Sequence, residues 1–163
     1  MKKIISVLVE NKAGVLARIA GLFGRRGFNI ASLTVGETED SEVSRMTIVA
    51  TGDDREIEQV EKQLNKQIDI IKVKTLETEL STRRELMLVK VNANAQARGE
   101  IIDIANIMKA KIVDISPSTL TLELSDRPER LDLFISMLDS YGIAEMARAG
   151  MVALGKGAGA IAL

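Results

Sequence analysis

The loop Asn11-Lys12-Ala13-Gly14 could bind a small anion, because it joins a β-rich segment at residues 3–10 to a segment with helical spacing. At the start of a helix, unpaired backbone N–H groups and the positive end of the helix dipole favour a carboxylate or phosphate. Gly14 lacks a Cβ that would block close approach, and Asn11 offers both a hydrogen-bond donor and an acceptor. An ordinary capped loop without a ligand explains the same residues and is the simpler interpretation.

The turn Gly27-Phe28-Asn29-Ile30 is a second candidate element. Taken alone, it is explained by turn chemistry. If it faces the same pocket as the first loop, Asn11, Asn29 and the helix N–H groups could bind the paired charges of an amino acid. An apolar wall would then select an aliphatic side chain, and it would consist of Val15, Leu16 and Ile30.

The residue types exclude most enzyme chemistry. The chain has no cysteine and no histidine, which excludes thiol nucleophiles, disulfides, histidine-dependent catalysis and Cys/His zinc sites. No pair of carboxylates lies in an apolar setting suited to acid–base catalysis. We therefore predict no catalytic residue, no metal site and no cofactor bound by this chain.

Two further motifs do not predict a ligand. The tail at 150–157 comes close to a P-loop, but Gly157 replaces the Ser or Thr that would hold magnesium, so we predict a flexible tail. The acidic loop at 37–42 lacks the spacing and central glycine of an EF-hand, so we predict a solvated run of charges.

The composition is that of a folded soluble protein. Of 163 residues, 46% are hydrophobic and 28% are charged, and 22 basic residues nearly balance 23 acidic ones. With no basic excess and with only three Phe and one Tyr as aromatic residues, nucleic-acid binding is not expected. The N-terminal apolar run ends at Glu10, too early for a signal peptide or a membrane span. We expect a cytoplasmic protein that contacts neither nucleic acid nor membrane.

Hydrophobic spacing predicts strand, helix, strand, strand, helix, strand in the first half of the chain. The first helix begins at Val15 and stops at Gly27. Asp53 and Glu56 have capping-box spacing at the start of the second helix. The predicted strands lie at 3–10, 29–36, 43–51 and around 71–73.

The same pattern repeats in the second half. Polar residues at 77–85 predict a linker. Asp126 and Glu129 repeat the capping-box spacing around Pro128, ahead of the last helix. The other predicted elements are strands at 86–91, 111–116, 119–124 and 143–154, and a helix at 100–108.

Two tandem ferredoxin-like βαββαβ units of the α+β class account for this pattern, each with an antiparallel sheet and two helices on one face. The predicted division is 1–76, a linker at 77–85, and a second domain at 86–163. Each sheet would leave its other face open or an edge unpaired, so we expect association through the sheets.

Five segments carry a family resemblance. They are Ile5-Ser-Val-Leu-Val-Glu-Asn11-Lys-Ala-Gly14-Val-Leu-Ala-Arg-Ile, Gly21-Leu-Phe, Arg26-Gly-Phe-Asn-Ile-Ala-Ser-Leu-Thr-Val, Ser44-Arg-Met-Thr-Ile and Arg84-Glu-Leu-Met-Leu-Val-Lys-Val. Over essentially its whole length, the chain resembles the regulatory small subunit of acetolactate synthase, whose N-terminal unit is an ACT domain.

The resemblance implies that residues 1–76 bind an effector and dimerise. It implies a separate catalytic large subunit that carries thiamine diphosphate and magnesium, with FAD as a further candidate. The small subunit would activate this partner and confer feedback inhibition by valine in branched-chain amino acid biosynthesis. The family's effector elements, shared across an ACT homodimer, map onto Asn11, Lys12, Ala13, Gly14, Val15 and Leu16, and onto Asn29 and Ile30.

Two other interpretations stay open. The chain could be a free-standing ACT-type amino-acid sensor that acts on transcription or on another enzyme. An enzyme in its own right would need an acid–base or cofactor site that the sequence does not contain. The sequence does not decide among valine, leucine and isoleucine as effector, nor does it identify the surface that meets a large subunit.

Overall fold

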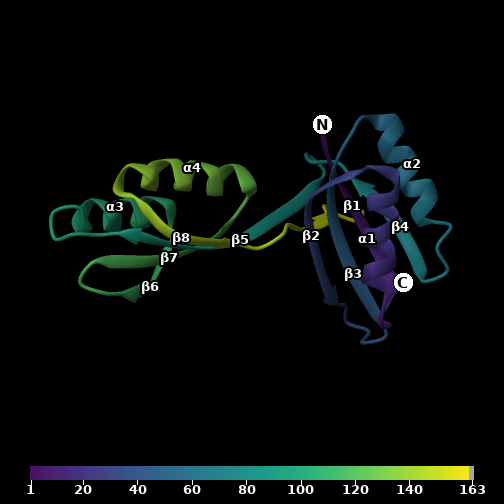
Figure 1. Cartoon of the computed structure of the whole chain (residues 1–163), viewed down its shortest axis with the longest axis horizontal. Helices are drawn as coiled ribbons and strands as arrows, with labels where there is room; N and C mark the ends of the chain where they lie inside the picture. The colour runs from purple at the N-terminus through teal and green to yellow at the C-terminus, as the bar shows by residue number, and fades with distance from the viewer. Residues whose placement is uncertain (162–163) are drawn as a thin grey trace. The chain divides into compact units, whose positions relative to one another are not determined.

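Two antiparallel sheets, each with helices on one face, organise residues 1–161, which the computed structural model describes (Figure 1). Met1–Arg83 and the segment from Gly150 onward form the first unit, and Arg84–Ala149 forms the second. The predicted α+β class with two tandem ferredoxin-like units is confirmed. The division differs from the predicted one because the C-terminal segment packs with the first unit.

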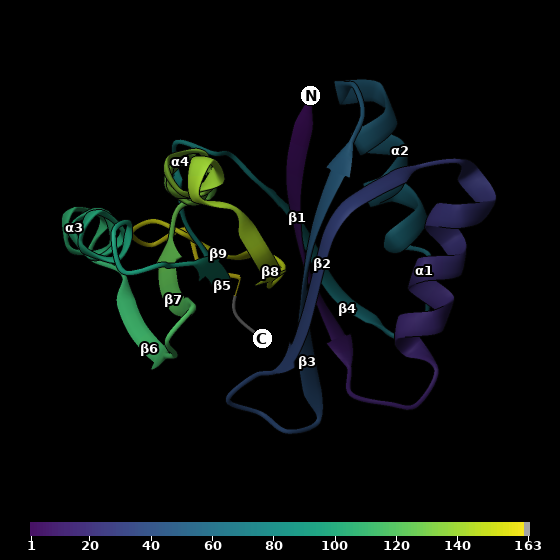
Figure 2. The same cartoon turned by 60° about the vertical axis from the view of Figure 1, so that its left-hand side comes forward.

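The first unit has the predicted βαββαβ order. Its elements are β1 (Lys2–Glu10), α1 (Val15–Arg26), β2 (Asn29–Glu37), β3 (Val43–Thr51), α2 (Asp54–Leu64) and β4 (Ile70–Leu76). The strand order is β2-β3-β1-β4, and all neighbours are antiparallel. Helices α1 and α2 lie on one face of this sheet (Figure 2).

Local backbone chemistry sets the ends of both helices. Gly27 adopts a left-handed conformation with φ of 69°, and its N–H donates to the Gly24 carbonyl at 3.2 Å, so α1 stops there as predicted. The Asp53 carboxylate accepts from the Glu56 N–H at 2.9 Å, and the Glu56 carboxylate accepts from the Asp53 N–H at 2.8 Å. These two bonds form the predicted capping box of α2.

The core of the first unit lies between the sheet and its two helices. Phe23 of α1 meets Phe28 edge to face, with ring centroids 6.3 Å apart. The buried members of this core are Ile5, Val7, Val9, Val15, Ile19, Leu22, Phe23, Met46, Ile48, Ala50, Ile57, Val60 and Leu64.

The opposite face of the first sheet is covered by the C-terminal segment. The predicted last strand at 143–154 is interrupted, and its end forms β9 (Val152–Gly155), which pairs with β5 (Ser81–Asn92). Side chains of the segment and the sheet form two buried clusters. One consists of Ile4, Val49, Leu76, Met151 and Ala153, and the other of Leu8, Val43 and Ile161. The prediction of a flexible tail at 150–157 is therefore wrong. Of the two alternatives predicted for the first sheet, an open face or an unpaired edge, the described residues show the unpaired edge, at β2.

The second unit repeats the βαββαβ order. After β5 come α3 (Arg98–Met108), β6 (Lys111–Ile115), β7 (Thr119–Asp126), α4 (Pro128–Leu138), the 3₁₀ turn η1 (Asp139–Tyr141) and β8 (Ile143–Arg148). The strand order is β6-β7-β5-β8, and α3 and α4 lie on one face (Figure 1). Its core includes Met87, Val89, Leu122, Leu131 and Phe134, all fully buried.

Two local features of the second unit differ from prediction. Strand β5 already begins at Ser81, inside the predicted linker at 77–85, where Glu85 is nearly buried and pairs with Arg148 at 2.5 Å. Asp126 does not cap α4. Partial burial opposes its ionisation, but hydrogen bonds from the Arg127 N–H and from Arg130 Nε prevail and lower the pKa of this carboxyl. These two arginines thus hold the carboxylate that the sequence assigns to a capping box.

Removing the capping box of α2 tests this account of the fold. Asp53→Ala should lower the free energy of unfolding of the full chain by about 1 kcal/mol, because the Glu56 N–H loses its acceptor. Urea unfolding followed by circular dichroism measures the change. The control is Glu39→Ala in the exposed hairpin loop, with an expected change within about 0.5 kcal/mol. Equal midpoints for the two variants would contradict the prediction.

Candidate functional site

The predicted binding loop lies between the end of β1 and the start of α1. The Lys12 N–H donates to the Glu10 carbonyl at 2.9 Å, and the Val15 N–H donates to the Lys12 carbonyl at 3.4 Å, so the chain reverses within a few residues. Gly14 completes the turn with φ of 86°, a conformation that L-residues adopt only with strain. Its carbonyl accepts from the Arg18 N–H at 3.0 Å. Gly14 is therefore required by the backbone itself.

The N-terminus of α1 is uncompensated. Within residues 1–161, no side chain caps this helix, and its first turn contains no acidic residue. By contrast, the first turns of α2, α3 and α4 each contain an acidic residue. The Val15 N–H donates to the Lys12 carbonyl, but the other N–H groups of the first turn and the positive dipole end of α1 are left for another negative group, as an anion site requires.

Asn11 is held by the hairpin between β2 and β3. Its Nδ2 donates to Glu37 Oε1 at 3.1 Å and to the Ser41 carbonyl at 2.8 Å, and its N–H donates to the Glu42 carbonyl at 2.7 Å. Both amide hydrogens are therefore used. The side chain can offer a ligand its acceptor, Oδ1, but not the donor that the sequence analysis also expects.

An ion pair that the sequence analysis missed holds this loop in place. Arg18 Nη2 lies 2.6 Å from Asp69 Oδ2, and the Asp69 side chain is only 11% exposed. The Asp69 carbonyl accepts from the Glu10 N–H at 2.9 Å. A Cβ added to Gly14 would lie 3.3 Å from Arg18 Nη1. The spacing of one helical turn from Gly14 could have identified Arg18, whereas no local pattern identifies Asp69.

The remaining loop residues take different roles. Lys12 Nζ lies 2.7 Å from Glu10 Oε2, and this hydrogen bond raises the pKa of the exposed Lys12 ammonium. Val15 is buried in the core, so it does not form the predicted apolar wall. Ala13 is exposed, and Leu16 is 45% exposed and available for contact.

The register places Asn29 and Ile30 far from Asn11 in the same copy. Asn29 and Lys2 both pair with Thr51, at the end of the sheet where β1 begins. Asn11 follows the other end of β1, and at about 3.3 Å per residue the two ends lie about 30 Å apart. Asn29 is exposed, and Ile30 is half-buried against the core. One copy therefore does not bring the two predicted elements into one pocket.

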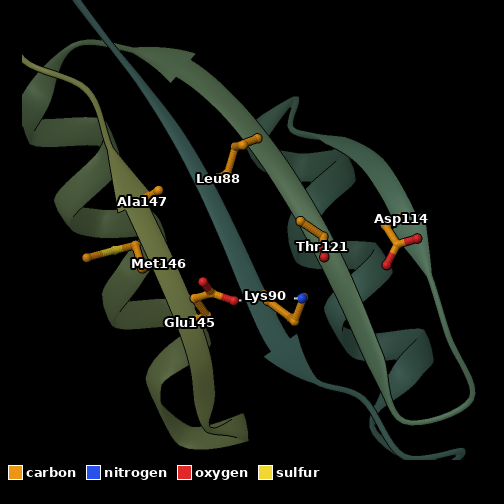
Figure 3. Close-up of a pocket in the computed structure, with 7 residues that line it drawn as sticks. All are labelled: Leu88, Lys90, Asp114, Thr121, Glu145, Met146 and Ala147. Carbon is orange, nitrogen blue, oxygen red and sulfur yellow. Dashed lines mark ion pairs between the residues drawn. The ribbon is translucent and has the colours of Figure 1, made fainter.

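The second unit has hollows that the sequence analysis did not predict. One of about 350 Å³ lies on the open face of its sheet, where Lys90 of β5 and Glu145 of β8 face each other across 3.8 Å (Figure 3). Another of about 570 Å³ lies beside the loop after β5 and includes Asn94 and Tyr141. Neither contains a residue of the predicted effector loop. The first is lined by Leu88, Lys90, Asp114, Thr121, Glu145, Met146 and Ala147.

The described residues contain neither a cluster of metal ligands nor a membrane-spanning helix. Across residues 1–161, no group of three Asp or Glu side chains could hold a metal ion. In the acidic hairpin, the Asp40 carboxylate accepts from the Glu42 N–H at 2.9 Å. None of the described helices is both long and apolar enough to cross a membrane.

Two family models match consecutive parts of the chain. Residues 5–72 match the AHAS (acetohydroxyacid synthase) small subunit-like ACT domain, and residues 84–157 match the small subunit of acetolactate synthase. The chain belongs to the acetolactate synthase small-subunit family. The boundary between the two matches falls close to Arg83, where the first unit gives way to the second.

Individual relatives agree with this assignment. The acetolactate synthase small subunit of Mycolicibacterium smegmatis is 50% identical over 153 residues, which are 94% of this chain and 90% of the relative. The isozyme 3 small subunit of Salmonella typhimurium is 43% identical and covers 96% and 97% of the two chains. The crystal structure of the small subunit from Thermotoga maritima matches with a TM-score of 0.90 and 38% identity over 96% of this chain and 98% of that one. The resemblance seen in the sequence motifs is confirmed.

The ion pair between Arg18 and Asp69 provides a test of what holds the Asn11–Gly14 loop in place. Arg18→Ala should lower the free energy of unfolding by about 1–2 kcal/mol, because it leaves the nearly buried Asp69 carboxylate without its cation. Exposure of half of the Arg18 side chain keeps the cost below that of a fully buried pair. Lys62→Ala, which breaks the exposed pair with Glu58, is the control and should cost less than about 0.5 kcal/mol. Equal urea midpoints for both variants would argue against a structural role for the Arg18 pair.

Proposed function

We propose that this chain is the non-catalytic regulatory subunit of an acetolactate synthase, which binds valine for feedback inhibition and activates a catalytic large subunit. The observation that carries the proposal is the uncompensated N-terminus of α1 next to the acceptor Asn11 Oδ1. The positive end of the helix dipole suits the carboxylate of a free amino acid, and the hydrogen-bond acceptor Asn11 Oδ1 suits its ammonium group.

Each end of the effector then has a partner. The valine carboxylate accepts from the N–H groups that follow Val15 in the first turn of α1, and Gly14 leaves room for it to approach. The ammonium donates to Asn11 Oδ1, and the Glu37 carboxylate at 3.1 Å from Asn11 Nδ2 adds negative charge on that side. The exposed Leu16 provides an apolar contact for a branched side chain.

A homodimer through the edge of β2 completes the site. Within the described residues, β2 pairs with β3 alone, so its other edge is free. Glu37, at one end of β2, binds Asn11, whereas Asn29 is at the other end. When two such edges pair antiparallel about a two-fold axis, the Asn29 end of one copy meets the Glu37 end of the other. Asn29 and Ile30 of one copy then reach the Asn11 loop of the other, and the dimer has two equal sites.

Catalysis belongs to the large subunit in this proposal. That partner would hold thiamine diphosphate and magnesium, with FAD as a further candidate, and both subunits would act in the cytoplasm. The absence of histidine and cysteine from the sequence supports this division of labour.

Substitution of Gly14 separates inhibition from activation. Gly14→Asp should abolish inhibition by valine while it leaves activation of the large subunit mostly intact. The φ of 86° strains any side chain by about 1 kcal/mol. A carboxylate ~4 Å from that of the effector repels it by about 4 kcal/mol before screening, at an effective dielectric near 20. Arg18 nearby offsets part of this repulsion.

Gly14→Ala, which adds strain without charge, should weaken inhibition less. Valine titrations of the enzyme reconstituted with each variant measure the change in inhibition. If the Gly14→Asp enzyme stayed as sensitive to valine as the parent, the effector would have to bind elsewhere.

Mixed dimers test whether the site is shared. Asn29→Ala should weaken valine binding about tenfold or less, because it removes hydrogen bonds worth about 0.5–1.5 kcal/mol. If each site combines the loop of one copy with Asn29 of the other, a dimer of one Gly14→Asp chain and one Asn29→Ala chain has one site in which both residues are unchanged. Co-expressed chains with different tags should therefore regain tight valine binding in calorimetry, relative to either variant homodimer. No recovery would mean that each copy carries a complete site.

Copurification with a large subunit tests the function as a whole. The purified chain alone should make no acetolactate, with or without thiamine diphosphate and magnesium. It should bind the large subunit, raise its activity and make that activity sensitive to valine. Turnover by a preparation free of large subunit would overturn the non-catalytic assignment. A valine-binding chain that neither copurifies with nor affects the large subunit would favour a free-standing sensor.

A further inference from the structure

The C-terminal segment at 150–161 is bonded to three strands of the first sheet. The Met151 N–H donates to Ser32 Oγ of β2 at 3.0 Å. Arg45 of β3 donates to the Ile161 carbonyl at 3.2 Å, and Lys74 of β4 donates to the Gly159 carbonyl at 2.9 Å. Because these bonds use the backbone of the segment, they fix its path across the sheet as well as its burial.

The segment crosses β2 at a distance that only glycine permits. A Cβ added to Gly150 would lie 2.2 Å from Thr34 Oγ1 and 2.8 Å from the Leu33 carbonyl oxygen. Thr34 Oγ1 is also the one buried side-chain oxygen or nitrogen in residues 1–161 without a hydrogen-bond partner. Such an atom is normally paired or hydrated, so its burial reflects how closely the segment packs on it.

Strand β2 is less buried than β3 and β1, the two central strands of its sheet. It is an edge strand with no fully buried residue, and its register with β3 shifts between Ile30 and Ser32. A register shift interrupts the hydrogen-bond ladder locally. Beyond this shift, β2 is held by the remaining β3 ladder, by Leu33 against the helix-side core and by the bond between Asn11 and Glu37. On the other face of the sheet, it is held by the C-terminal segment on Ser32 and Thr34.

We propose that the contact of Gly150 and Met151 with β2 is a positioning element of the effector site. It holds Ser32 and Thr34 and so sets where Asn29 and Ile30, just before the register shift, stand along the free edge of β2. The residues at this contact do not touch the effector and act through the strand. This inference rests on the proposed function, because it assigns Asn29 and Ile30 to valine binding.

Substitutions in the full-length chain test the contact. Gly150→Ala adds a methyl group that meets Thr34 and Leu33, and Ser32→Ala removes the bond to Met151. The matched control is Gly36→Ala, also on β2, where an added Cβ meets nothing within 4 Å. Adding Thr34→Ala to Gly150→Ala removes the nearer clash and should restore part of the lost function.

Two readouts are compared for each variant. Hydrogen exchange of the β2 amides should become at least tenfold faster in Gly150→Ala, several-fold faster in Ser32→Ala and unchanged in Gly36→Ala. The Kd for valine, measured by calorimetry, should rise in the same order and by at least tenfold in Gly150→Ala. Activation of the large subunit without valine should stay within about twofold of the parent, which a general loss of folding would not allow.

The outcomes separate this inference from the proposed function. Unchanged exchange of β2 in both Gly150→Ala and Ser32→Ala would overturn the anchoring role. Faster exchange with an unchanged valine Kd would overturn the link to the effector site. A parent chain that binds no valine would overturn the proposed function and the effector part of the inference, and exchange would then decide the anchoring of β2 by itself.

Discussion

Burial of β1 on both faces is the constraint that organises the first unit. Six consecutive residues, Ile4–Val9, are buried. Their alternate side chains point to opposite faces, so the two helices can cover only half of them. Burial of one large aliphatic side chain stabilises a protein by about 1.5–3 kcal/mol. Leaving Ile4 and Leu8 in water would therefore cost several kcal/mol, and the C-terminal segment meets this requirement with Met151, Ala153 and Ile161.

The central strand of the second unit, β5, is buried on one face only over residues 86–91. In β5, Met87, Val89 and Val91 are buried against the helices, while Leu86 and Leu88 are more than 40% exposed on the other face. This alternation is typical of an antiparallel sheet with a single packed face. Two units with the same order of elements therefore have different numbers of layers. The difference follows from the side chains of their central strands.

The strand arrangement of the first unit also positions the loop around Asn11 and Gly14. Because β1 and β2 both pair antiparallel with β3, their C-terminal ends lie at the same end of the sheet. Glu37 and the Ser41 carbonyl can therefore hold Asn11 in place. The same register places Asn29 at the opposite end of β2. One copy therefore has the Asn11 loop at one end of its strands and Asn29 at the other end. Symmetric pairing of two copies is a direct way to join the parts.

Local features of the fold could be predicted because their causes lie within a few residues. Gly14 and Gly27 end or begin a helix through their own backbone conformations, and the Asp53 capping box needs only Glu56 three residues later. Asp126 marks the limit of such patterns. It has the same spacing to an acidic residue, but Arg127 and Arg130 take its carboxylate instead.

The sequence by itself determined the element order, the fold class, the family and the loop around Gly14. The tertiary structure alone decided which groups remain free in that loop and where the chain returns at its C-terminus. Asn11 loses its donors to residues 26 and 30 positions away, and Met151 binds Ser32 across 119 positions. Such contacts depend on strand register and on which face is still uncovered once the nearby elements have packed. Periodicity within a short window reports neither.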